Sequence, residues 1–87
     1  MDFDYDPAKS AANAAKHGID FEDAQALWRD PRLLEAPART DDEPRFIVIG
    51  RIGDRVWAAV CVRRGDVVRI ISVRRARKEE VDIYEGD

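Results

Sequence analysis

The sequence predicts an α+β domain with two N-terminal helices, an antiparallel sheet of three to four strands and a short C-terminal helix. Three observations lead to this prediction. An alanine-rich segment near the start has helix-start and helix-stop residues at its ends. Segments rich in Val and Ile then follow one another with turn residues between them, and helix-forming residues return after Arg75. Because helices precede consecutive strands, we expect the helices to pack against one face of the sheet.

The first helix is predicted to run from Pro7 to His17. Asp6 is a preferred N-cap, and Pro7 suits the first turn because its missing N–H would have no partner there. Gly18 is the usual residue at a helix C-terminus. A second helix is expected to begin at residues 20–23, which resemble a capping box, and Pro31 prevents it from continuing far.

Beyond Pro31 the sequence changes to short segments that are rich in β-branched residues. Strands are expected at residues 33–37, 45–51, 55–62 and 67–73. The polar segment from Arg39 to Pro44 is expected to form the first connection, and Gly53 and Gly65 mark the turns of an antiparallel meander. Residues 75–85 are expected to form the last helix. Strict alternation along the final strand places Arg69 on one face and Arg74 on the other.

Length and composition exclude several classes of protein. With 87 residues, 45% of them hydrophobic and 38% charged, the chain predicts a single folded domain spanning residues 1–87. One cysteine permits no internal disulfide, and one histidine with one cysteine cannot complete a structural zinc site. Cys61 lies in an apolar segment and is expected to be buried. No apolar run is long enough for a membrane span and no signal peptide is visible, so a cytoplasmic protein is expected.

The charge is concentrated in one segment although the chain as a whole carries −3. Residues 63–78 contain seven basic residues and one acidic residue, whereas residues 79–87 contain five acidic residues and none that are basic. The basic residues are Arg63, Arg64, Arg69, Arg74, Arg75, Arg77 and Lys78. Arginine presents a planar fork that matches phosphate. The segment therefore predicts either a phosphate-binding surface or a solvated surface neutralised by the acidic C-terminal residues.

Individual residues within this pattern leave alternatives open. Arg69 has apolar neighbours, so its guanidinium is expected to pair with a carboxylate, for which Glu43 and Glu80 are candidates, or to contact phosphate. His17 is the only histidine, and an imidazole suits proton transfer, but a histidine at a helix end more often caps carbonyls. Lys16 alone reads as a surface lysine. Neither a phosphate-binding glycine motif nor a cluster with metal-ligand spacing is present, so no cofactor or metal is expected.

The order of short motifs resembles the BrnT family of bacterial toxins over about residues 3 to 85. The set comprises Asp-Pro-Ala-Lys with Asn13, Lys16-His17-Gly18-Ile19, Phe21-Glu22-Asp23-Ala24, Asp30-Pro31, Glu43-Pro44-Arg45, Gly50, Arg69-Ile70-Ile71-Ser72-Val73-Arg74-Arg75-Ala76, Glu80 and Tyr84. The resemblance implies a RelE-like ribonuclease fold and inhibition of translation by RNA cleavage. It also implies neutralisation by a BrnA antitoxin of the ribbon-helix-helix type in a heterotetramer, with operator DNA contacted only through the antitoxin.

The resemblance implies functional residues where the motifs align. The catalytic candidates are Lys16, His17, Glu43, Arg64, Arg69 and Arg74. The RNA-binding candidates are Arg45, which matches the family's Glu-x-Arg, and four further members of the basic segment: Arg63, Arg75, Arg77 and Lys78. Arg77 stands where the family often has Thr, and the negative net charge predicts a modest general affinity for RNA.

Two hypotheses follow. In the first, the chain is a metal-independent endoribonuclease toxin in which Arg64, Arg69 and Arg74 converge on one phosphate, and Lys16, His17 or Glu43 transfers the proton. In the second, the chain is a non-catalytic interaction module whose arginines bind an acidic protein partner. Cleavage of RNA by the pure protein separates them.

Overall fold

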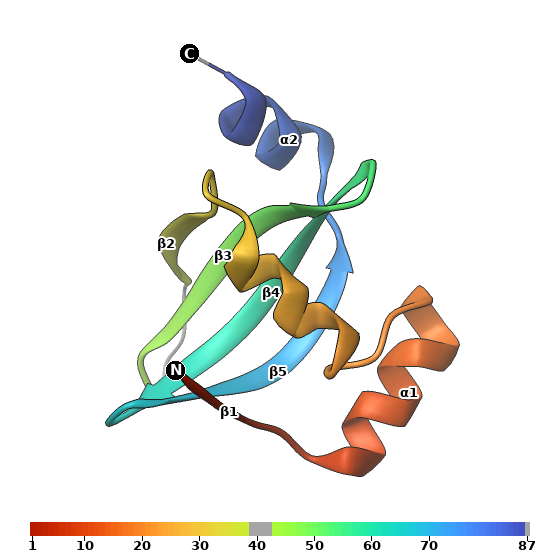
Figure 1. Ribbon diagram of the computed structural model, residues 1–87, viewed down its shortest axis with the longest axis vertical. Coiled ribbons are helices and arrows are strands. Elements are labelled where there is room, and N and C mark those ends of the chain that lie inside the picture. Colours follow the sequence, from red (N-terminus) through yellow and green to blue (C-terminus); the bar gives the residue numbers. More distant parts are fainter. Residues whose placement is uncertain (39–42, 87) are drawn as a thin grey trace.

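The computed structural model describes residues 1–38 and 43–86 (Figure 1). Its elements are, in order, β1 (Asp2–Asp4), α1 (Pro7–His17), the 3-10 helix η1 (Asp23–Arg29), β2 (Leu34–Ala38), β3 (Arg45–Ile52), β4 (Arg55–Arg64), β5 (Val67–Arg75) and α2 (Lys78–Glu85). The turn expected from Arg39 to Pro44 lies, for residues 39–42, outside the described residues. No helix in the described ranges is long and apolar enough to cross a membrane.

The five strands form one mixed sheet in the order β1-β5-β4-β3-β2. The predicted meander is confirmed as β3, β4 and β5, and the short strand expected at residues 33–37 is confirmed as β2. The prediction of a purely antiparallel sheet of three to four strands is wrong, because β1 pairs with β5 in parallel. Only Phe3 of β1 packs against the core, so a strand of three residues leaves little hydrophobic pattern in the sequence.

The first helix has the predicted bounds and caps. The Asp6 side chain accepts a hydrogen bond from the N–H of Ala8, and Gly18 adopts a positive φ of 83°. The second helix is not an α-helix but the 3-10 helix η1, whose three-residue turn places Ala24 and Leu27 together toward the core. Helix α2 begins three residues later than expected, because the chain up to Arg75 still pairs with β4.

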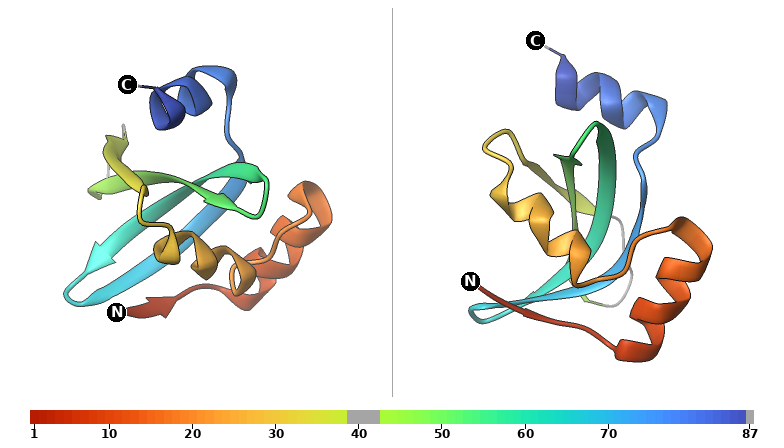
Figure 2. Two further views of the ribbon diagram at one scale, coloured as in Figure 1. Left: turned by 45° about the horizontal axis from the view of Figure 1, so that its top comes forward. Right: turned by 45° about the vertical axis from the view of Figure 1, so that its right-hand side comes forward.

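The helices cover both faces of the sheet, so the expectation that all of them pack on one face is wrong (Figure 2). On one face, here called the η1 face, Val48 and Ala59 pack with residues of η1. On the other, the α2 face, Ile49 and Ala58 pack with Tyr84 of α2. Successive residues of β3 and β4 point to opposite faces, and near α2 most of them are apolar on both faces. Each face therefore needs a helix to cover it.

Helix α2 is anchored through Tyr84, whose hydroxyl donates a hydrogen bond to Asp30. Burial alone would raise the pKa of Asp30, but this hydrogen bond and two backbone N–H donors, those of Arg32 and Arg51, lower it below its ordinary value. The guanidinium groups of the same two arginines lie 5.6 and 5.9 Å from the centre of the Tyr84 ring. The hydrogen bond to Asp30 and the cation–π contacts of the two arginines therefore hold α2 against the sheet.

The outer edge of β5 is completed by a side chain where β1 ends. Strand β1 pairs only with residues 67–69 of β5. Further along, the Oδ1 atom of Asn13 accepts a hydrogen bond from the N–H of Val73 at 3.1 Å, and its Nδ2 atom donates to the C=O of the same residue at 2.9 Å. A third bond, from Nδ2 to the C=O of Ile19, measures 2.8 Å. The buried Asn13 amide thus stands in for a neighbouring strand and attaches α1 to the sheet.

Candidate nucleic-acid interface

A bulge in β5 decides which arginines share a face. The pairing of β4 with β5 shifts at Val60 and Cys61, and Ile71 has no direct partner across the pair. As a result Arg69 lies opposite Val62 and Arg74 lies opposite Ala58, both on the α2 face. The prediction from strict alternation, which placed these two arginines on opposite faces, is therefore wrong.

Three arginines gather on the α2 face near the β4–β5 hairpin. The strand register places Arg45, Val62, Arg69 and Asp4 in one row across four strands. Arg64 pairs with Val67 at the next position on this face. Helix α2 lies at the opposite end of the sheet from this hairpin, as all the ribbon views show (Figures 1 and 2). We call Arg45, Arg64 and Arg69 the basic end.

Two residues of the basic end already hold a carboxylate. The Arg69 guanidinium donates to Asp4 of β1 at 2.5 Å, and that of Arg64 donates to Glu43 at 3.4 Å. The prediction that Arg69 pairs with Glu43 or Glu80 is wrong. Glu43 binds Arg64 instead, and Glu80 binds Arg74. Asp4 was missed from the sequence, where its only signal is the polar-apolar alternation of residues 2–4.

Arg45 contributes a buried donor. Its side chain is partly covered, and its Nε atom is buried without a hydrogen-bond partner among the described residues. Arginine carries five N–H donors, so its other nitrogens can still reach an acceptor. A guanidinium with an unpaired donor on the same face as two further arginines is suited to binding an oxyanion.

Arg74 has a different role from Arg64 and Arg69. Both of its terminal nitrogens bind Glu80, at 2.7 and 2.9 Å, and the two side chains are only 25% and 16% exposed. This hydrogen bonding raises the pKa of Arg74 and lowers that of Glu80, which also accepts the N–H of Arg77 at 2.8 Å. Because of the bulge, Arg69 and Arg74 lie opposite β4 residues four positions apart, Val62 and Ala58, which is about 13 Å along the sheet at about 3.3 Å per residue. The expected convergence of three arginines on one phosphate is therefore not seen, and Arg74 fixes the start of α2.

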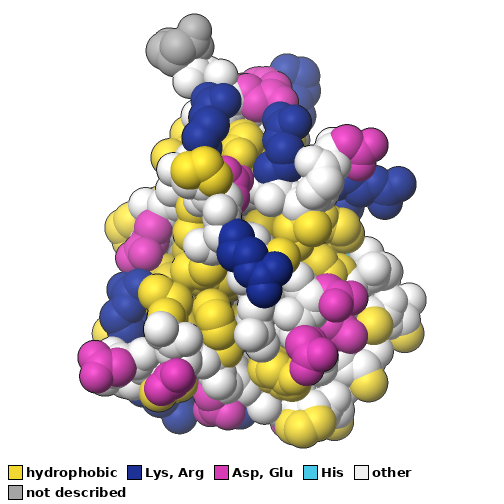
Figure 3. All heavy atoms as spheres, viewed as in Figure 1, with side chains coloured by type: hydrophobic (Ala, Val, Ile, Leu, Met, Phe, Trp, Pro, Cys, Tyr) yellow, Lys and Arg dark blue, Asp and Glu magenta, His cyan; other side chains and the backbone are white. Residues whose placement is uncertain are grey.

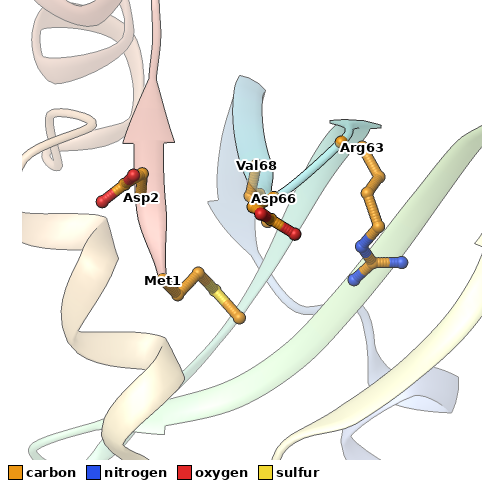
Figure 4. A pocket seen from close by; sticks show the side chains of 6 residues that line it. Met1, Asp2, Arg63, Asp66 and Val68 are labelled. Carbon is orange, nitrogen blue, oxygen red and sulfur yellow. The ribbon is translucent and has the colours of Figure 1, made fainter.

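Two of the predicted RNA contacts lie on the η1 face. Arg63 extends from the end of β4 over β3, away from Asp2 (Figure 4). Its guanidinium lies 4.3 Å from the centre of the Phe46 ring and donates twice to Glu35 at 3.2 Å, which raises the pKa of Arg63. Arg75 lies on the same face, 5.6 Å from the ring of Trp57. Neither side chain belongs to the basic end.

The η1 side of the molecule does not concentrate positive charge. Basic and acidic side chains are interspersed over this surface (Figure 3). An open pocket of about 550 Å³ beside Arg63 is also lined by Asp2 and Asp66, which would repel a phosphate. The charge of the basic segment is thus divided between two faces.

The remaining candidates lie at the ends of helices. Arg77 and Lys78 are exposed at the start of α2, where Lys78 bonds Asp82 at 3.1 Å. Lys16 and His17 are the last residues of α1. Within the described part of the chain, no hydrogen bond or ion pair joins them to the basic end. Of the three candidates for proton transfer, Glu43 is the one with a described contact to an arginine of the basic end, Arg64.

The described residues offer neither a reactive thiol nor a metal site as an alternative to the arginines. Cys61 is fully buried as predicted, and burial raises the pKa of its thiol to about 12, which leaves it protonated at neutral pH. Among residues 1–38 and 43–86, no group of three or more His, Cys, Asp or Glu side chains is placed to hold a metal ion. The arginines of the α2 face are the notable chemical feature of this structure.

Comparison with known proteins bears directly on these arginines. No curated protein matches the chain. A family model, described as ribonuclease toxin, BrnT, of type II toxin-antitoxin system, matches residues 5–80 and so covers α1, the arginine-bearing strands and the start of α2. The match spans most of the 87 residues. The chain belongs to the BrnT family of ribonuclease toxins of type II toxin-antitoxin systems.

Proposed function

We propose that the chain is an endoribonuclease that cleaves RNA without a metal ion, inhibits translation and binds the RNA backbone at the basic end of the α2 face. One observation carries this proposal: the register brings Arg45, Arg64 and Arg69 from three strands to one end of the face that α2 leaves open. We propose further that residues 1–87 act as one domain and that it works in the cytoplasm.

The chemistry needs positive charge where the phosphate gains negative charge. In RNA cleavage the 2′-oxygen attacks the neighbouring phosphorus, and the charge on the phosphate oxygens increases before the 5′-oxygen leaves. Guanidinium groups held on a sheet stabilise that charge without reorganisation. Arg69 would contact the scissile phosphate, with Arg45 and Arg64 on either the same or an adjacent phosphate.

Proton transfer requires a base and an acid. We propose that Glu43 takes the proton of the 2′-hydroxyl, because its carboxylate contacts Arg64 of the basic end. The leaving 5′-oxygen must receive a proton in return, and the remaining candidates are His17 and Lys16 at the end of α1, which no described contact joins to the basic end. A loss of cleavage in His17→Ala but not in Lys16→Ala would assign the acid.

Metal independence is testable directly. The proposal draws support from the lack of a three-ligand cluster among the described residues. We expect cleavage by the purified protein to persist in excess chelator. Cleavage that stops in chelator and returns with Mg²⁺ would contradict this part of the proposal.

Membership of a type II toxin-antitoxin family implies an antitoxin partner. We propose that this partner is a BrnA-like ribbon-helix-helix protein in a heterotetramer, and that it covers the basic end and thereby blocks RNA. Operator DNA would then be contacted only through the antitoxin. We expect the backbone amides around Arg64 in β4 and Arg69 in β5 to exchange hydrogen more slowly in the complex than in the free chain.

The central test is the effect of Arg69→Ala on cleavage by purified protein. We expect at least about a hundredfold loss, because electrostatic ligands of a reacting group contribute this much. Arg55→Ala is the matched control, since Arg55 is an exposed arginine at the far end of β4. Undiminished cleavage by Arg69→Ala would refute the assignment. A wild-type protein that binds antitoxin but cleaves no RNA would instead favour the non-catalytic interaction module.

A further inference from the structure

The basic end carries its own competitor for phosphate. Asp4 lies directly beside Arg69 because β1 and β5 pair in parallel with these two residues in register. The Oδ2 atom of Asp4 lies 2.5 Å from the Nη1 atom of Arg69. The contact is thus fixed by backbone pairing as well as by the attraction of the two charges.

A carboxylate and a phosphate compete for the same donors. Both present oxygens to the fork of a guanidinium, and both favour short, charge-assisted hydrogen bonds. The side chain of Arg69 is 27% exposed and that of Asp4 is 51% exposed, so the pair is accessible from solvent. An RNA phosphate that approaches Arg69 therefore meets a negative charge already in place.

The stability of the fold does not account for this pair. Exposed ion pairs contribute little to folding, because water screens them and ordering the side chains costs entropy. Arg69 and Arg74 are almost equally covered, but Glu80 is much less exposed than Asp4, at 16% against 51%, and Glu80 also binds the backbone at the start of α2. The Asp4 carboxylate has no such second hydrogen bond among the described contacts.

We propose that Asp4 is a specificity-determining residue: its carboxylate occupies the phosphate position at Arg69 and weakens the binding of RNA that does not also reach the other arginines of the basic end. This inference rests on the proposed function of the basic end. Asp4 holds the guanidinium ready in the free protein and is displaced when RNA binds. A single phosphate gains little from the exchange, whereas a backbone that reaches Arg45 and Arg64 as well gains enough to displace the carboxylate.

The test is the affinity of Asp4→Asn for a short single-stranded RNA with 2′-O-methyl groups, which cannot be cleaved. Fluorescence anisotropy at about 0.1 M salt measures the dissociation constant. We expect binding about fivefold tighter than wild type, because one negative charge close to the phosphate is removed. Asp4→Glu retains the carboxylate and should bind within about twofold of wild type. The melting temperature of each variant reports whether the fold is intact.

Glu35→Gln is the matched control. It makes the same change in net charge and also removes the carboxylate partner of an arginine, but on the η1 face. We expect its RNA affinity to stay within about twofold of wild type, since a local rather than a global charge effect is proposed.

The possible results separate the inference from the proposed function. If Arg69→Ala abolishes RNA binding while Asp4→Asn binds like wild type, Asp4 is no competitor and the inference is wrong, although the basic end stands. An equal gain in Glu35→Gln would also overturn it, because net charge alone would then explain the effect. If RNA binding is unaffected by Arg69→Ala, the proposed function itself fails.

Discussion

Replacement of Asn13 by Leu removes the side chain that completes the outer edge of β5. Leucine has the same branch point at Cγ but no polar atoms, so it fills the space and keeps water out. The N–H and C=O of Val73 and the C=O of Ile19 then lose the partners that Asn13 provides. Each buried polar group left unpaired costs about 1–3 kcal/mol, and we therefore expect the free energy of unfolding to fall by at least about 3 kcal/mol.

For a domain of this size, such a loss lowers the melting temperature by about 12–24 °C. Urea unfolding followed by tryptophan fluorescence measures it, because Trp28 and Trp57 both contact the core. Ala12→Leu is the matched control, since it places the same side chain at an exposed position of α1. If the two variants unfold within about 1 kcal/mol of each other, the Asn13 amide does not complete the sheet edge.

Asn13→Asp tests the donor side of the same amide through its pH dependence. An aspartate keeps an acceptor toward the N–H of Val73 but sets a second oxygen against two carbonyl groups. Only the protonated acid can donate there, so its pKa in the folded state is raised above the unfolded value of about 3.9. The variant is then most stable below about pH 4 and loses stability as pH rises through the raised pKa. A stability that increases with pH relative to wild type would refute this reasoning.

Two further predictions concern ionisable groups whose pKa is shifted by the fold. Hydrogen bonding to Arg74 lowers the pKa of Glu80 below 4.5, so this group stabilises the fold above the unfolded pKa and stops doing so as pH falls through the folded value. Glu80→Gln should therefore cost about 2 kcal/mol at pH 7 but little near pH 3, as measured by urea unfolding across that range; a constant difference would contradict it. The Cys61 thiol, with a pKa raised to about 12, should resist iodoacetamide at pH 8 until the protein unfolds. Labelling of the folded protein at the rate of a free thiol, followed by mass spectrometry, would disprove its burial.

The elements that were predicted correctly have local signals. Helix α1 is defined by Asp6 before it and Gly18 after it, and both act as caps in the structure. The meander is defined by Gly53 and Gly65, whose positive φ values of 63° and 60° suit tight turns between strands. Such signals lie within a few residues of the structure that they determine, so they can be recognised without knowledge of the fold.

The features that were missed depend on distant pairing. Nothing in the run of Ile70, Ile71 and Ser72 marks a bulge, because neither Gly nor Pro interrupts it and the irregularity arises only where β5 meets β4. Strand β1 is equally invisible, since Asp4 finds its partner 65 residues further along the chain. The arginines themselves were recognised, but their grouping was not, because the bulge reverses the faces assigned beyond Ile71.

Charge counted along the sequence also differs from charge arranged in space. The segment 63–78 supplies Arg64 and Arg69 to the basic end, but Arg45 comes from β3, and Arg63 and Arg75 lie on the η1 face. A net charge of −3 is thus compatible with RNA binding, because the potential at a phosphate is dominated by charges within about a Debye length.

Sheet register is what holds this arrangement together. The three arginines of the basic end come from β3, β4 and β5, and each faces the α2 side only in the observed pairing. A slip of one residue between β3 and β4 would turn Arg45 to the η1 face and would move Ile49 away from Tyr84. The slip is opposed by burial of Ile49 and Ala58 beneath Tyr84 at the other end of the same strands. The packing of α2 therefore keeps Arg45 in line with Arg69, although α2 itself contributes no residue to the basic end.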